Sequence, residues 1–273
     1  MYLQEEQQKT YQENGFLLLD NLFDKAQIKA ITAKLSTVYW KNTPGTVLEE
    51  DQATVRGIHE DPTENGFLDK ISKNALIVEP AMQLLGSQVY IHQLKINFKA
   101  AFSGDLWPWH QDYIFWQKED GMPTPRAVNV VVFLEEVNEF NGPLCLIPGS
   151  HQEGIISSLN QIEQDYAASE DSKWISSFQS NLKYTTPEQT IIKLVEKYGI
   201  EAPKGKPGTV LFFHPNCVHG SANNISPFSR KIAIITYNSI DNIPIAVDNP
   251  RPDFLVGRDY RAIKPLPEQA LIL

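Results

Sequence analysis

The 273-residue chain carries 24 basic and 33 acidic residues, which gives a net charge of −9. That excess of acid argues against binding to nucleic acid or to an anionic membrane surface, so we expect a small-molecule substrate and leave a partner protein open. The N-terminus lacks a signal-peptide pattern and no apolar run reaches membrane-spanning length. Two cysteines do not suggest a disulfide framework. These features predict a cytoplasmic protein.

The N-terminal third, about residues 1–86, is expected to be mainly helical and to support a sheet. Asp24 is placed as the N-cap of its clearest helix. The apolar residues of that helix recur at helical spacing: Ile28, Ile31, Leu35 and Val38.

From about residue 88 the pattern changes to strands, beginning with residues 89–98. Alternate side chains of a strand leave opposite faces. One predicted face is apolar apart from His92, and the other carries the polar residues Gln93, Lys95 and Asn97. Such a polar face is suited to lining a binding cavity.

Further strands and turns predict an all-β barrel or sandwich in a single domain, residues 1–273, with its core at about 88–240 and an irregular tail at 241–273. The strands are expected at 127–134, 144–147, 209–213 and 231–237. A capping box at Thr186–Gln189 predicts one helix that ends at Gly199. The polar segment 152–184 is either a lid over the site or a solvated insertion.

A metal site is predicted from three residues. His110 and Asp112 stand one residue apart, and in an extended strand both side chains leave the same face, where they can bind one ion. His219 follows the buried strand 209–213 and fits the third ligand. Two histidines and one carboxylate on one face of iron(II) leave three coordination positions open. The remaining histidines His59, His92, His151 and His214 are interpreted as structural.

Arg230 supplies a cation near this site. The turn-forming segment 223–229 is expected to fold the chain back and bring Arg230 beside His219. A guanidinium there suits a bidentate contact with the distal carboxylate of an anionic ligand.

Several longer runs carry a family resemblance. On them the chain resembles the phytanoyl-CoA dioxygenase family of iron(II)/2-oxoglutarate oxygenases, particularly free L-leucine 5-hydroxylases, and more distantly ectoine hydroxylase. The runs shared with leucine hydroxylases are Leu48–Asp51, Thr54–Arg56, Trp109–Asp112, Arg126–Val130, His219–Ser221, Asn224–Phe228, Ile235–Asn238 and Arg251–Pro252. Those shared with ectoine hydroxylase include Trp116, Glu119–Pro123 and Asn141–Leu144.

The resemblance implies a double-stranded β-helix, or jelly roll, in which iron(II), 2-oxoglutarate and O2 hydroxylate a small substrate and release succinate and CO2. The substrate expected is a free aliphatic L-amino acid, namely L-leucine attacked at C5, with ectoine or another small amino-acid derivative as the alternative. Residues assigned to 2-oxoglutarate are Arg230, Asn97, Lys95 and Asn129. Residues assigned to the substrate are Gln93, Trp116, Ile114, Phe115 and Arg56, the last also being interpretable as part of a surface ion pair.

The sequence argues against two other functional classes. A non-catalytic jelly roll that holds zinc or nickel would be expected to complete its coordination with protein ligands, whereas this pattern supplies three ligands and a cation that awaits an anion. Halogenation needs a coordination position without a carboxylate, and Asp112 fills that position.

Overall fold

The chain folds into two facing antiparallel sheets. The structure is a computed structural model that describes residues 1–35, 43–64, 66–156, 159–160, 178 and 182–271. The larger sheet contains β1 (Phe16–Leu19), β2 (Thr46–Leu48), β3 (Val55–Glu60), β4 (Val89–Lys99), β6 (Ala127–Phe133), β10 (Val210–Phe213) and β12 (Arg230–Ser239). The smaller sheet contains β5 (Trp107–His110), β7 (Leu144–Leu146) and β11 (His219–Ser221), and β8 (Leu159–Asn160) pairs separately with β9 (Tyr184–Thr185).

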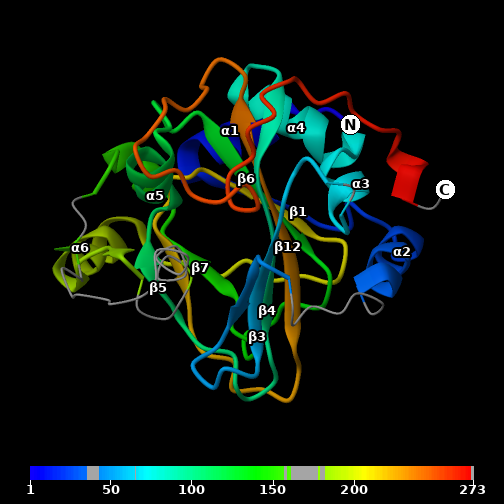
Figure 1. The fold of residues 1–273 in the computed structure, drawn as a ribbon. Helices are drawn as coiled ribbons and strands as arrows, with labels where there is room; N and C mark the ends of the chain where they lie inside the picture. Colours follow the sequence, from blue (N-terminus) through cyan, green and yellow to red (C-terminus); the bar gives the residue numbers. More distant parts are fainter. Residues whose placement is uncertain (36–42, 65, 157–158, 161–177, 179–181, 272–273) are drawn as a thin grey trace.

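The strand order of the larger sheet is β1-β10-β6-β12-β4-β3-β2, and that of the smaller sheet is β5-β11-β7. Strands far apart in sequence are therefore neighbours, as in the expected jelly roll. The helices are α1 (Glu5–Asn14), α2 (Lys25–Leu35), α3 (Asp69–Ser72), α4 (Ala75–Leu85), α5 (Asp112–Asp120) and α6 (Glu188–Tyr198), with 3-10 turns η2 (Ser150–Glu153) and η4 (Glu268–Leu271). Figure 1 shows α2, α3 and α4 on one side of the larger sheet, and β5, β7, α5 and α6 on the other.

Alternation along β6 shows how the sequence divides the interior into two cores. Val128, Val130 and Val132 belong to the core that lies under the helices. Val131 and Phe133 belong to the core between the two sheets. Because both faces of β6 are buried, the strand reads as a nearly continuous apolar run, and Asn129 is its one polar side chain.

The N-terminal third differs from the expected helical support. Strands β1, β2 and β3 all lie within it and all join the larger sheet. β1 and β2 are only four and three residues long, so neither shows enough alternation to be distinguished from a loop or a helix segment.

The predicted helix ends are partly confirmed. Asp24 caps α2, since its Oδ1 accepts from the backbone of Gln27 at 2.8 Å, and Gly199 ends α6 with a positive φ of 78°. The expected capping box at Thr186 is wrong, because Pro187 occupies the N-cap position and makes no side-chain cap.

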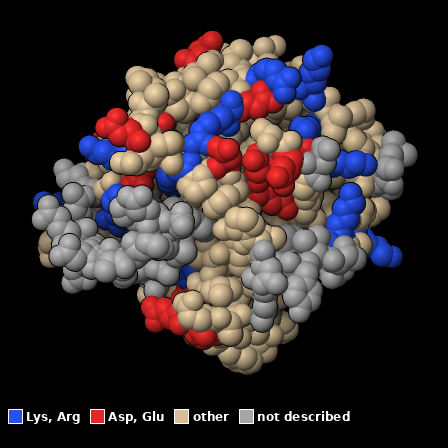
Figure 2. Space-filling view, viewed as in Figure 1, with Lys and Arg blue, Asp and Glu red and all other residues tan. Residues whose placement is uncertain are grey.

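Two predictions fall at least partly outside the described residues, namely the place of Val38 on its helix and most of the segment 152–184. No helix in the described part of the chain combines the length and the apolar character needed to cross a membrane. Figure 2 shows acidic and basic side chains interspersed over the described part of one face of the molecule.

Candidate active site

The three predicted metal ligands come together between the two sheets. His110 ends β5 and His219 begins β11, and the two residues are cross-strand partners with ring centroids 4.2 Å apart. Asp112 joins them, so that one ligand atom from each residue lies within 4.8 Å of the others. All three side chains are buried.

Gly220 allows the two histidine strands to approach. A Cβ at this position would lie 2.9 Å from the carbonyl oxygen of Trp107 on the neighbouring strand, closer than such atoms are normally found. A larger residue would push β11 away from β5 and separate the two imidazoles. The glycine that follows His219 is therefore part of the geometry of the site.

Backbone carbonyls fix the tautomers of both histidines. The Nδ1 of His110 lies 2.7 Å from the oxygen of Pro108, and the Nδ1 of His219 lies 3.0 Å from the oxygen of Cys217. A carbonyl can only accept a hydrogen bond, so each Nδ1 carries the proton and each Nε2 is left with a lone pair. Burial and the neighbouring His110 lower the pKa of His219 to about 4, which keeps that lone pair available at neutral pH.

Asp112 does not continue the strand, contrary to the simple parity argument. Gln111 is extended, with φ −116° and ψ 135°, and Asp112 is already the first residue of α5. The single extended residue is enough to keep the two ligands on the same side. Burial acts to raise the pKa of Asp112, but His219 and His110 outweigh it and hold the pKa well below its ordinary value. The carboxylate is therefore ionised and ready to bind a cation.

Two cavities meet at His110 and Asp112 and share four lining residues: Lys95, Trp107, His110 and Asp112. We call them the Arg230 cavity and the Arg251 cavity after the arginine that lines each. The other residues of the Arg230 cavity are Asn97, Leu144, Phe213, His219, Arg230 and Ile234. The other residues of the Arg251 cavity are Gln93, Phe115, Trp116, Phe178 and Arg251.

Arg230 is a buried cation that forms no ion pair with any described residue. It is 1% exposed, and among the described residues its Nε has no hydrogen-bond partner. The same holds for the buried Oγ of Ser221 and the Nε1 of Trp107. Burial and the nearby Arg56 lower the pKa of Arg230 to about 9, so the guanidinium stays charged at neutral pH. A buried charge is costly unless it is paired, which makes this cavity suited to a carboxylate ligand.

The residues assigned to 2-oxoglutarate separate into two groups. Lys95 and Asn97 line the Arg230 cavity together with Arg230. Asn129 does not line it, because its side chain is held by Asp112 and Thr236. Burial lowers the pKa of Lys95, whereas the nearby Asp112 acts in the opposite direction.

Of the residues assigned to the substrate, Gln93, Phe115 and Trp116 line the Arg251 cavity. Ile114 is buried in the adjoining core and lines neither cavity. Arg56 lines neither cavity and is no surface residue, being 1% exposed. Its nitrogens donate to Glu49 and to the backbone oxygens of Phe178 and Leu106, and its guanidinium lies 4.0 Å from the Trp107 ring centroid.

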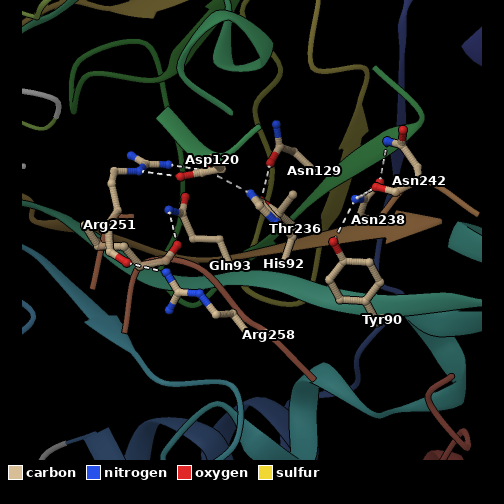
Figure 3. Close-up of polar contacts among 11 residues, drawn as sticks. Tyr90, His92, Gln93, Asp120, Asn129, Thr236, Asn238, Asn242, Arg251 and Arg258 are labelled. Carbon is tan, nitrogen blue, oxygen red and sulfur yellow. Dashed lines mark hydrogen bonds and ion pairs between the residues drawn. The ribbon is translucent and has the colours of Figure 1, made fainter. Parts of the chain in front are cut away.

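Arg251 was not identified as a site residue from the sequence. It belongs to the irregular C-terminal tail and lines the cavity. A bidentate ion pair with Asp120, at 2.7 and 2.6 Å, holds its side chain there. Asp120 also lies 3.2 Å from the Nε2 of His92 (Figure 3). In the sequence, the one feature that pointed to Arg251 was the Arg251–Pro252 run, which is shared with leucine hydroxylases.

A β-bulge explains why His92 faces this ion pair. Opposite β12, Gln93 pairs with Thr236 and Ile91 pairs with Tyr237, so β4 contains one extra residue at His92. A bulge breaks the strict alternation of side chains and re-aims the residues beside it. His92 therefore contacts Asp120 and Trp116 instead of joining Leu94 in the helix-covered core, where alternation placed it.

Comparison with known proteins gives a consistent picture. The family model of phytanoyl-CoA dioxygenase (PhyH) matches residues 11–232. L-proline trans-4-hydroxylase of Streptomyces griseoviridis is 35% identical, over 94% of this chain and 93% of that protein. Ectoine dioxygenase of Bordetella bronchiseptica is 34% identical, over 99% of this chain and 88% of that protein.

Solved structures agree with these relatives. EctD from S. alaskensis, crystallised with 2-oxoglutarate and 5-hydroxyectoine, superposes with a TM-score of 0.78 at 30% identity, covering 97% of this chain and 88% of that one. A second structure of the same protein contains bound Fe. The triad of His110, Asp112 and His219 supplies a donor set that fits iron(II). The chain therefore belongs to the phytanoyl-CoA dioxygenase family and is an iron(II)/2-oxoglutarate-dependent hydroxylase.

Proposed function

We propose that the protein hydroxylates a free aliphatic L-amino acid, with L-leucine oxidised at C5 as the first choice. The observation that carries this proposal is the composition of the Arg251 cavity, which combines one paired arginine with four aromatic side chains beside the metal ligands. An arginine suits a substrate carboxylate, and an aromatic wall suits an aliphatic side chain.

Arg251 has the geometry for such a contact. Its Nε and Nη2 bind Asp120, and no described residue is bonded to its Nη1. The ion pair holds one edge of the guanidinium and leaves the other for a ligand. Gln93 is anchored on the same wall, because its Nε2 donates to the oxygen of Leu255 at 3.0 Å. Its Oε1 is the group proposed to accept from a substrate ammonium.

The aromatic residues give the cavity its apolar character. Phe115, Trp107, Trp116 and Phe178 line it beside His110 and Asp112. These side chains exclude water from the reacting carbon and direct an alkyl chain toward His110 and Asp112. Iron(II) and 2-oxoglutarate, when bound, supply the oxidation in which O2 converts C–H to C–OH while 2-oxoglutarate becomes succinate and CO2.

Arg230, Lys95 and Asn97 are proposed to hold 2-oxoglutarate. Arg230 would bind the distal carboxylate, assisted by the hydroxyl of Ser221, since both are buried and unpartnered among the described residues. Lys95 lines both cavities and so lies between the cosubstrate and the substrate.

Two related substrates are natural alternatives. The relatives named above act on proline and ectoine, and ectoine also carries a carboxylate that Arg251 would suit. A hydrophobic pocket discriminates against one extra methylene by only about 1–3 kcal/mol, so side activities are expected.

The test is a panel of free amino acids and ectoine incubated with iron(II), 2-oxoglutarate and oxygen. Succinate formation and the mass of the product are followed together. We expect leucine to react fastest and to give a product that is heavier by about 16 mass units, which is the mass of the added oxygen atom. Faster conversion of ectoine or proline, or a requirement for carrier-tethered leucine, would contradict the substrate assignment and leave the family assignment intact.

A further inference from the structure

Asn129 is a fully buried amide in an apolar environment. It lies on the inner face of β6 with 0% exposure, and the next residues on that face are Val131 and Phe133. A buried amide is unfavourable unless its donors and acceptor are satisfied. The partners of Asn129 therefore show what this residue does.

Those partners form a chain of hydrogen bonds that ends at the metal site. The Nδ2 of Asn129 donates to the Oδ2 of Asp112 at 2.7 Å. The Oγ1 of Thr236 donates to the Oδ1 of Asn129 at 2.7 Å, as drawn in Figure 3. A carboxylate can only accept, so the NH2 end of the amide must face Asp112, and the threonine hydroxyl holds it in that orientation.

The register of the sheet places the three groups in line. Thr236 on β12 is the cross-strand partner of Asn129 on β6. Both side chains lie on the face that looks toward α5, whose first residue is Asp112. The chain thus links two central strands of the larger sheet to the start of the helix that carries the carboxylate.

We propose that Asn129 is a positioning residue that keeps Asp112 a one-oxygen ligand. Oδ1 lies 3.6 Å from the Nε2 of His110 and Oδ2 lies 3.7 Å from the Nε2 of His219, so both oxygens are near an imidazole. The hydrogen bond from Asn129 engages Oδ2 and leaves Oδ1 as the oxygen for the ion. A carboxylate that used both oxygens would take one of the positions that the cosubstrate and oxygen need. This proposal concerns the metal ligand itself and does not depend on which amino acid is the substrate.

The experiment measures metal binding rather than turnover. Cobalt(II) is titrated anaerobically into the protein, and binding is followed by calorimetry and by the visible absorption of the bound ion. Asn129→Leu preserves the approximate volume and removes both hydrogen bonds. Because partners of metal ligands typically contribute 10–100-fold to metal affinity, we expect its cobalt Kd to rise by about 10- to 100-fold, with an altered absorption spectrum.

Two further variants separate positioning from general destabilisation. Thr236→Val retains Asn129 and removes only the hydroxyl that orients it, so we expect a smaller rise in Kd, roughly threefold or more. Asn238→Leu is the matched control, since Asn238 is an equally buried amide of the same sheet that bonds Tyr90 and Asn242 instead. Its Kd is expected to stay within about twofold of the unsubstituted protein.

Three outcomes would overturn the proposal. One is an unchanged Kd and spectrum in a folded Asn129→Leu protein. Another is an equal loss of affinity in Asn238→Leu. If Asn129→Leu does not fold, the decision falls to Thr236→Val, and an unchanged cobalt Kd in that variant is the third.

Discussion

Arg251 and Asp120 form a buried bidentate ion pair on the wall of the cavity that adjoins the metal ligands, with nitrogen–oxygen distances of 2.7 and 2.6 Å. The side chains are 5% and 0% exposed. Burying such a pair is favourable only when the geometry is good and the remaining groups are satisfied. The pair holds a segment of the C-terminal tail against α5 and presents an arginine to the cavity.

The first prediction tests Arg251 as the substrate-carboxylate group. Arg251→Lys keeps the charge beside Asp120 but loses the planar guanidinium, so we expect the KM for the amino-acid substrate to rise by about tenfold or more. The KM for 2-oxoglutarate should change by less than about twofold, because Arg230 lines the other cavity. Succinate formation at varied substrate concentrations measures both. An unchanged substrate KM would contradict the assignment, and Arg126→Lys, at a partly exposed arginine that lines neither cavity, serves as control.

Arg230 gives a second prediction. Removal of its guanidinium in Arg230→Gln eliminates a charged hydrogen bond that contributes about 1.5–3 kcal/mol, so the affinity for 2-oxoglutarate should fall by roughly tenfold or more. Anaerobic calorimetry with iron(II)-loaded protein measures this without turnover. Cobalt binding should be preserved, since Arg230 is not among the metal ligands. Unaltered 2-oxoglutarate affinity would remove the proposed role.

Asp112 provides the third prediction. Asp112→Ala removes the only carboxylate of the triad and leaves two neutral imidazoles, so iron(II) should no longer be retained and succinate formation should cease. The measurement is succinate release with and without substrate. Normal succinate formation in this variant would show that the ion is held elsewhere.

His214 makes a prediction about stability and pH. Its Nδ1 accepts a hydrogen bond from the backbone of Asn216 at 3.1 Å, and burial followed by the charge of His151 lowers its pKa to about 4. The unfolded chain binds a proton near pH 6.5, whereas the folded chain does so only near pH 4. The contribution of His214 is therefore complete above about pH 6.5 and is lost as the pH falls toward 4, by at most about 1.4 kcal/mol per pH unit.

His214→Gln keeps an acceptor at this position and removes the titration. The free energy of unfolding of this variant, measured by urea denaturation between pH 4 and 7, should fall less steeply with decreasing pH than that of the unsubstituted protein. Parallel curves for the two proteins would show that His214 does not titrate differently on folding.

The sequence alone predicted a metal site and the residue types that would form it. His110, Asp112 and His219 were identified from residue type, spacing and strand pattern, and the structure brings the three together. The turn residues before Arg230 also predicted that it returns to the same region, where it lines a cavity with His219. These features are readable because they depend on local periodicity and on residue types that few other roles require.

Only the tertiary structure decided what surrounds that centre. The bulge at His92 reverses the face that alternation predicts, and bulges leave no reliable mark in one sequence. Asn129 was assigned to the cosubstrate. The register of β6 against β12 instead places it opposite Thr236, and its side chain forms hydrogen bonds with Thr236 and Asp112. Arg251 joins α5 across 131 positions of the sequence. Such contacts depend on how distant segments pack, and local pattern carries no information about that packing.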